Sequence, residues 1–320
     1  LSILVLYLSL KDDFREKIHY LFSFDFKWLV LSFSLIIIYW VLKGIVLYYY
    51  IKKLDKNYSI LKGIHLMLTT QLFHAITPFA SGGQPWQIYK LKKDGLSLGE
   101  STNIIIQDFI AYQIALVLLG VIAVISNHLF HILPAINNIR YLVMIGFTIN
   151  IFVIILLFAV AFNENLNKKI TYKAVNFLYK IKILKDKEKY LNKAEEFVKN
   201  FHNGAKILIE DKFGFLKVIS LNFIALTFQY LIPFTLMKGL NIYVNPFYVI
   251  VTSAYVMLID SMIPTPGSTG GLEYGFISFF KNFIKGSKLS IIMIVWRLIT
   301  YYFGIIIGVI ALNIHKEDDK

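Results

Sequence analysis

The sequence has no cysteine and few charges: 17% of its 320 residues are Asp, Glu, Lys or Arg. Without cysteine the chain can hold no disulfide, thiol nucleophile or cysteine metal site. His128 and His131 share an i,i+3 spacing, but no carboxylate accompanies them, and no Ser/His/Asp constellation is visible. Zinc fingers, basic recognition helices and RNA-binding aromatic motifs are also missing. We therefore expect no catalytic residue, no metal, no cofactor and no nucleic acid partner.

Apolar residues are abundant instead and make up 57% of the chain, against about 45–50% in soluble domains. Two shorter apolar pieces, at 64–80 and 247–263, would each be roughly 25 Å long as helices, which is marginal for hydrocarbon about 30 Å thick. Five other runs exceed the roughly 20 residues that a spanning helix needs. These runs are 28–51, 97–125, 142–162, 215–237 and 289–313.

Basic residues set the expected orientation, because cytoplasmic loops carry an excess of Lys and Arg. The net charge is +13, and many of the lysines lie at 51–62, 90–96 and 163–214. We place these segments and the C-terminus in the cytoplasm, and segments 11–27 and 127–139 outside. The apolar opening at 1–10 is too short to span. We expect it to be the end of a first transmembrane helix whose start is missing.

This orientation has a consequence for the two shorter pieces. Because the loops on either side of 64–80 are both cytoplasmic, that piece must enter the membrane and return. By the same reasoning 247–283 is a hairpin from the outside. Re-entrant backbone of this kind is tolerated only where it is buried in protein or lines a wet cavity. The alternative is that each piece is an ordinary, slightly short transmembrane helix.

Each shorter piece runs into a break of the same pattern. The breaks are TPFASGG at 77–83 and TPGSTGG at 265–271, so both fit TPxx[ST]GG. Two copies in matching places indicate an internal duplication. The halves, 26–126 and 215–313, have opposite expected orientations, as in transporters whose interrupted helices meet near the midplane. We predict an all-α, polytopic transmembrane helix bundle with two re-entrant helical hairpins in an inverted repeat, forming one integral membrane domain over 1–320.

The breaks also indicate a binding chemistry. Proline ends one half-helix and glycines let the chain turn. The next half-helix then begins with free N–H groups, which suit phosphate or carboxylate. We expect Ser81 and Thr269 to cap these starts. The alternative is that the breaks only turn the chain.

Charged residues at membrane depth are functional candidates by default. We expect Arg297 to contact a lipid phosphate or to pair with Glu273, and the carboxylates to handle polar or cationic headgroup atoms. The alternative for any of them is a structural pair inside the bundle, and Lys43 is a further charge within a span. The candidate substrate-binding residues are Ser81, Gly82, Gly83, Gln84, Gln87, Lys90, Asp108, Asp260, Thr269, Gly270, Gly271, Glu273 and Arg297.

The polar segment 163–214 places apolar residues at helical spacing among lysines: Val175, Leu178, Tyr179, Ile181 and Leu184. This pattern predicts basic linker helices. They can lie on the inner leaflet as amphipathic helices or form a solvated connection.

The segments TPFASGGQPWQIYKLKKDGLS and PTPGSTGGLEYGF resemble the two signature regions of the lysylphosphatidylglycerol synthase flippase-domain family, over about residues 26–313. The resemblance implies a multi-pass protein of a prokaryotic plasma membrane that moves lipids or lipid-linked groups between leaflets. In the full-length multiple peptide resistance factor, a separate domain transfers lysine from tRNA to phosphatidylglycerol, and exposing the product repels cationic antimicrobial peptides. Here Gln107 precedes Asp108 where the family usually has a basic residue. Gln84 and Gln87 stand where it often has Glu and Arg, which leaves the headgroup open.

Three functions follow. The first is a lipid flippase or exporter. The second is an enzyme such as a phosphatidylglycerol lysyltransferase, the label that the family would carry, although the sequence offers no means for that reaction. The third is a membrane partner of a separately encoded synthase. The sequence leaves the oligomeric state open.

Overall fold

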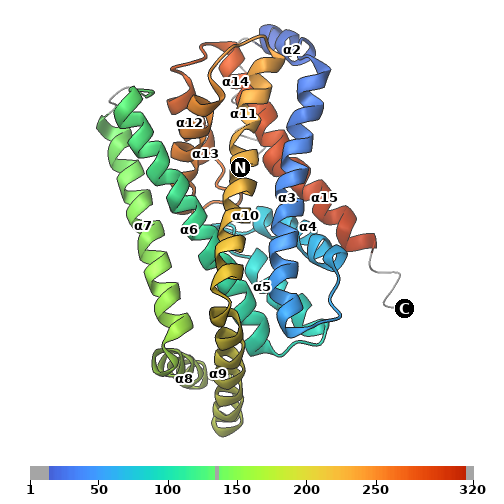
Figure 1. Ribbon diagram of the computed structural model, residues 1–320, viewed down its shortest axis with the longest axis vertical. Helices are drawn as coiled ribbons and strands as arrows, with labels where there is room; N and C mark the ends of the chain where they lie inside the picture. The colour runs from blue at the N-terminus through green and yellow to red at the C-terminus, as the bar shows by residue number, and fades with distance from the viewer. Residues whose placement is uncertain (1–13, 134–136, 315–320) are drawn as a thin grey trace.

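The structure is a computed structural model that describes residues 14–133 and 137–314 (Figure 1). These residues form helices and no strand, which confirms the all-α fold. Five helical stretches are long and apolar enough to cross a membrane, and they match the five predicted runs. They are Phe26–Leu54, Leu98–Phe130, Val143–Phe162, Lys212–Gly239 and Ser287–Ile314. The predicted first helix at 1–10 lies outside the described residues.

A short helix, α2 (Phe14–Phe22), precedes the first of these stretches. The spans α3 (Phe26–Leu54), α6 (Leu98–Phe130) and α7 (Asn137–Phe162) are continuous helices. The fourth is divided into α10 (Lys212–Tyr230) and α11 (Ile232–Gly239), because Pro233 lies in the first turn of α11. The fifth is divided into α14 (Ser287–Arg297) and α15 (Phe303–Ile314) by a π-helical turn, η2 (Leu298–Tyr302).

Side-chain caps fix where the long spans begin. The carboxylate of Asp25 accepts a hydrogen bond from Lys27 N at 3.0 Å, at the start of α3. At the start of α6, Ser97 Oγ accepts from Glu100 N at 3.2 Å, while the Glu100 carboxylate accepts from Ser97 N at 2.9 Å. This reciprocal pair satisfies two N–H groups that the helix itself leaves without partners.

The linker forms α8 (Glu164–Lys180) and α9 (Lys187–Glu210). Helix α9 packs on α6, and four of its apolar residues are buried: Ala194, Val198, Phe201 and Ala205. Their spacing of i, i+4, i+7 and i+11 places them on one helical face.

Asp211 marks the junction between the linker and α10. Its carboxylate caps α10 by accepting from Gly214 N at 2.8 Å, and it also accepts from Lys53 Nζ and Tyr49 OH of α3. The bond from Lys53, followed by that from Tyr49, holds the pKa of Asp211 well below its usual range. The contribution of this carboxylate to stability is therefore present at neutral pH and is lost progressively as the pH falls from the usual aspartate pKa to the lowered one.

The two shorter apolar pieces both end at the repeated motif. Helix α4 (Ile60–Ile76) leads through the first motif into α5 (Gly83–Lys93). Helix α12 (Pro246–Leu258) and the 3₁₀ turn η1 (Asp260–Met262) lead through the second motif into α13 (Gly271–Phe280). In Figure 1, α4 and α5 lie in the lower half of the bundle and α12 and α13 in the upper half. The two breaks meet, because Pro78 and Pro266 pair as a single antiparallel bridge.

Candidate functional site

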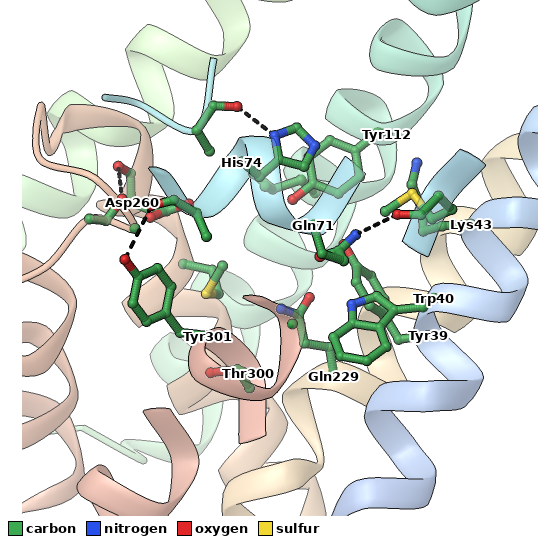
Figure 2. A pocket seen from close by; sticks show the side chains of 18 of the residues that line it. Tyr39, Trp40, Lys43, Gln71, His74, Tyr112, Gln229, Asp260, Thr300 and Tyr301 are labelled. Atoms are coloured by element: carbon green, nitrogen blue, oxygen red, sulfur yellow. Dashed lines mark hydrogen bonds between the residues drawn. The ribbon is translucent and has the colours of Figure 1, made fainter. Parts of the chain in front are cut away.

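A cavity of about 300 Å³ lies where the two breaks meet. Both motifs contribute to its wall, the first through Phe79 and Ala80 and the second through Gly267 and Ser268. Its lining also includes residues of α3, α6, α7, α10 and α15. Figure 2 shows Lys43, Trp40 and Tyr39 of α3 on one side of the pocket and Asp260 and Tyr301 on the other.

Lys43 and Asp108 form a buried ion pair in this wall. Lys43 Nζ donates to Asp108 Oδ1 at 3.1 Å and to Asn222 Oδ1 at 2.8 Å. The ammonium group also lies 5.0 Å from the centre of the Tyr112 ring. The three polar residues come from α3, α6 and α10, so the ion pair and the hydrogen bond to Asn222 together join three spans. A buried pair of this kind is costly to disturb, because removing one partner leaves an uncompensated charge.

Arg297 makes a second buried pair beside the other motif. Its Nε lies 2.7 Å from Glu273 Oε1, as an ion pair rather than a hydrogen bond. Its Nη2 donates to the Gly267 carbonyl oxygen at 2.7 Å and lies 3.4 Å from Thr269 Oγ1. The pairing of Arg297 with Glu273, one of the two sequence-based options, is therefore present. Through these contacts α14 holds the second break in place.

The predicted capping hydroxyls of Ser81 and Thr269 do not cap the half-helices, so that prediction is wrong; Gly82 N, at the start of α5, donates instead to Thr77 Oγ1 at 2.8 Å. Ser81 Oγ donates to the Pro78 carbonyl oxygen, and Thr269 Oγ1 donates to that of Pro266, both at 2.8 Å. The equivalent hydroxyl thus makes the same local bond in both copies of the motif. At the start of α13 the cap is instead the Glu273 carboxylate, which accepts from Gly270 N at 2.6 Å.

His74 and Tyr301 support the first break from within the cavity. His74 Nδ1 lies 2.5 Å from the Ala80 carbonyl oxygen, as expected for a packed polar residue. The Tyr301 hydroxyl donates to the Ala75 carbonyl oxygen at 3.1 Å, and its ring centre lies 4.6 Å from the Arg297 guanidinium carbon. Tyr301 belongs to the π-helical turn, and such turns are frequent at functional sites. Tyr301 therefore connects the last span to the end of α4, just before the first break, and to Arg297, which contacts the second break.

Five of the thirteen candidate residues line the cavity: Gln84, Gln87, Asp108, Asp260 and Arg297. Two more, Glu273 and Thr269, contact Arg297 but do not themselves line the cavity. The remaining six lie outside the lining. One of them, Lys90, forms an ion pair with Asp94 at 3.5 Å. The six are Ser81, Gly82, Gly83, Lys90, Gly270 and Gly271. Their roles in binding stay predictions.

Sequence reasoning missed several polar and aromatic residues of the site. Asn222, Gln113 and Asn150 lie in spanning helices, and the last two bond to each other at 3.2 Å beside the cavity. An amide within a spanning helix is the signal that could have identified them, because polar groups in lipid need partners. The aromatic lining carries no such signal, since aromatic residues occur throughout this chain.

The contact between Gly267 and Tyr301 gives a first prediction. Gly267 has a φ of +60°, and a Cβ there would lie 2.0 Å from Tyr301 Cε2. Gly267→Ala should destabilise the protein by about 1–3 kcal/mol through overpacking. The matched control is Gly270→Ala, which also has a positive φ but would place its Cβ in open space. In thermal unfolding in detergent, only Gly267→Ala should show coupling to Tyr301→Ala; equal coupling for both glycines would contradict this contact.

Comparison with known proteins places the chain among membrane proteins. The family model described as the lysylphosphatidylglycerol synthase TM region matches residues 1–308. A UPF0104 membrane protein of Archaeoglobus fulgidus is similar, at 24% identity over 295 residues, which covers 89% of this chain and 85% of that relative.

Proposed function

The chain belongs to the lysylphosphatidylglycerol synthase transmembrane-region family, and from this membership we propose that it is a lipid flippase or exporter. It moves the headgroup of a phospholipid, aminoacylated or not, or of a lipid-linked group between leaflets while the acyl tails stay in the bilayer. The observation that carries the proposal is a cavity with charged and amide side chains in its wall, at the meeting point of two helix breaks among apolar spans. Polar groups at membrane depth mark substrate pathways by default.

The proposal includes the arrangement of the two broken segments. The pairs α4–α5 and α12–α13 are re-entrant hairpins that enter from opposite sides, as halves 26–126 and 215–313 of an inverted repeat within one integral membrane domain. Their position in opposite halves of the bundle (Figure 1) and the contact between Pro78 and Pro266 support this arrangement. The protein lies in the plasma membrane of a prokaryote with its C-terminus in the cytoplasm, consistent with lysine-rich loops on that side.

The wall of the cavity carries charges of both signs, which suits a headgroup with both an anionic and a polar or cationic part. Lys43 and Arg297 are held near the cavity by their carboxylate partners, Asp108 and Glu273. A headgroup that binds either cation therefore replaces part of an existing ion pair. None of the ion pairs found in the described part of the chain includes Asp260, and this carboxyl group lines the cavity. The candidate set given above is the proposed substrate-binding site.

A leaflet-resolved assay tests this function. Purified protein is reconstituted in vesicles with tail-labelled phospholipids of anionic, zwitterionic and lysylated headgroups, and dithionite bleaches the outer leaflet. We expect complete loss of fluorescence for at least one headgroup. The control variant Lys92→Gln, which changes an exposed residue outside the cavity lining, should lose fluorescence at the same rate. Bleaching that stops at half for every lipid, as in protein-free vesicles, would contradict transport. Incorporation of lysine from lysyl-tRNA into phosphatidylglycerol would instead support the transferase alternative.

A further inference from the structure

Helix α8 begins where a membrane span ends. The apolar span Val143–Phe162 forms most of α7, and α8 starts at Glu164, with only Asn163 between them. Asn163 caps the new helix by accepting from Leu166 N at 3.0 Å. Figure 1 shows α8 almost end-on at the foot of α7, so it runs across the axis of that span. A helix in this place lies at the level of the lipid headgroups.

One face of α8 exposes apolar side chains in a row. Ile170, Ala174 and Phe177 are exposed, as is Ile181 directly after the last helical residue. The spacing of i, i+4, i+7 and i+11 places all four on one helical face. Phe177 is 61% exposed, although it is the largest of the four. Single exposed apolar residues are normal in proteins, whereas a contiguous row indicates a binding surface.

A row of lysines runs beside the apolar row. Lys169, Lys173 and Lys180 each precede one of its members by one residue, and all three are exposed. The neighbouring Lys168 is different, because it pairs with Glu195 of α9 at 3.7 Å. The only acidic residue within α8 is Glu164, in its first turn. An apolar row with flanking lysines is the chemistry that binds an anionic lipid surface.

We propose that this face of α8, defined by Ile170, Ala174, Phe177 and Ile181 with the three flanking lysines, is an anionic-lipid-binding surface that lies in the cytoplasmic leaflet. The apolar row enters the boundary between headgroups and acyl chains, and the lysines contact lipid phosphates or carboxylates. Because α7 delivers α8 to this level, the leaflet is the nearest surface that matches both rows. The inference does not depend on lipid transport, since it concerns how the linker is anchored.

The absence of native cysteine permits a direct test in the full chain. Ala174→Cys places a fluorescent label in the apolar row and leaves the three large apolar residues intact. Glu188→Cys is the matched control, because Glu188 is exposed in the first turn of α9, at the end of that helix far from α10. Each labelled protein is reconstituted in vesicles of phosphatidylcholine with or without phosphatidylserine. Quenching by aqueous iodide and by spin-labelled phospholipid is then measured.

With phosphatidylserine present, we expect lipid quenching and iodide protection at position 174 and the reverse at 188. Replacing Lys169, Lys173 and Lys180 by Gln should lower the equilibrium constant for binding of α8 to the lipid surface by about fivefold for each lysine. Iodide quenching at 174 equal to that at 188 would overturn the proposal. Protection that appears only at high protein-to-lipid ratio would also overturn it, because the surface would then bind a second copy of the chain.

Discussion

Lys43→Met alone should leave little folded protein in the membrane, whereas Lys43→Met combined with Asp108→Leu should fold and yet fail to transport. The single change leaves the Asp108 carboxylate, which lies 3.1 Å from Lys43 Nζ in the bundle interior, without its cationic partner. Stranding one partner of a buried pair typically costs about 3–5 kcal/mol. Replacing both partners by apolar residues of similar volume is often neutral or stabilising. The double variant therefore separates the folding role of the pair from its role in the cavity.

Size-exclusion profiles and thermal unfolding in detergent measure the first effect, and the vesicle assay measures the second. The reciprocal single variant, Asp108→Leu, should be as unstable as Lys43→Met because it strands the ammonium group. Transport by the double variant at the rate of the original protein would contradict the assignment. In that case the pair would be a structural connection between α3 and α6 only.

Arg297→Lys is the second change with a large expected effect, and it should abolish transport although it keeps the charge. The guanidinium reaches Glu273 through Nε and the Gly267 carbonyl oxygen through Nη2, each at 2.7 Å. A single ammonium group lacks the planar fork that makes such two-sided contacts. We therefore expect the second break to lose its anchor to α14.

The consequence can be measured without a transport assay. Ser268→Cys reports on the second break, because Ser268 is buried and lies between Gly267 and Thr269, which both contact Arg297. With Arg297→Lys, a water-soluble maleimide should label this cysteine faster than in the Arg297 background. The control is Lys281→Gln, a change at an exposed residue after α13. Unchanged labelling together with full transport would show that the anchor is not needed.

The spans and the breaks could be predicted from sequence because they depend on local composition. Length and hydropathy identified the five spans, and the repeated TPxx[ST]GG pattern marked the ends of α4 and α12. The interruption before Pro233 and the π-helical turn after Arg297 were not anticipated. The first had a local signal in the proline, whereas the residues of the second, LITYY at 298–302, include no proline or glycine that would mark it.

The partners of the charged residues could be predicted only in part. Arg297 and Glu273 come from neighbouring segments, and their pairing was one of two options. The contact of Lys43 with Asp108 and Asn222 joins residues far apart in the chain, so it depends on the relative depth of three spans. The caps were predicted wrongly because a hydroxyl three residues after proline can donate to the proline carbonyl oxygen, which competes with capping.

The central claim is that the two breaks meet within the bilayer and bound the cavity through which a headgroup passes. Pro78→Cys with Pro266→Cys tests it, because Cα atoms paired across an antiparallel bridge are about 4.5–5.5 Å apart, within the range of a disulfide. In lipid vesicles under mild oxidation, we predict that this disulfide forms, that transport stops and that a reductant restores it. Failure to form the disulfide in vesicles, or transport at the full rate by the cross-linked protein, would contradict the account.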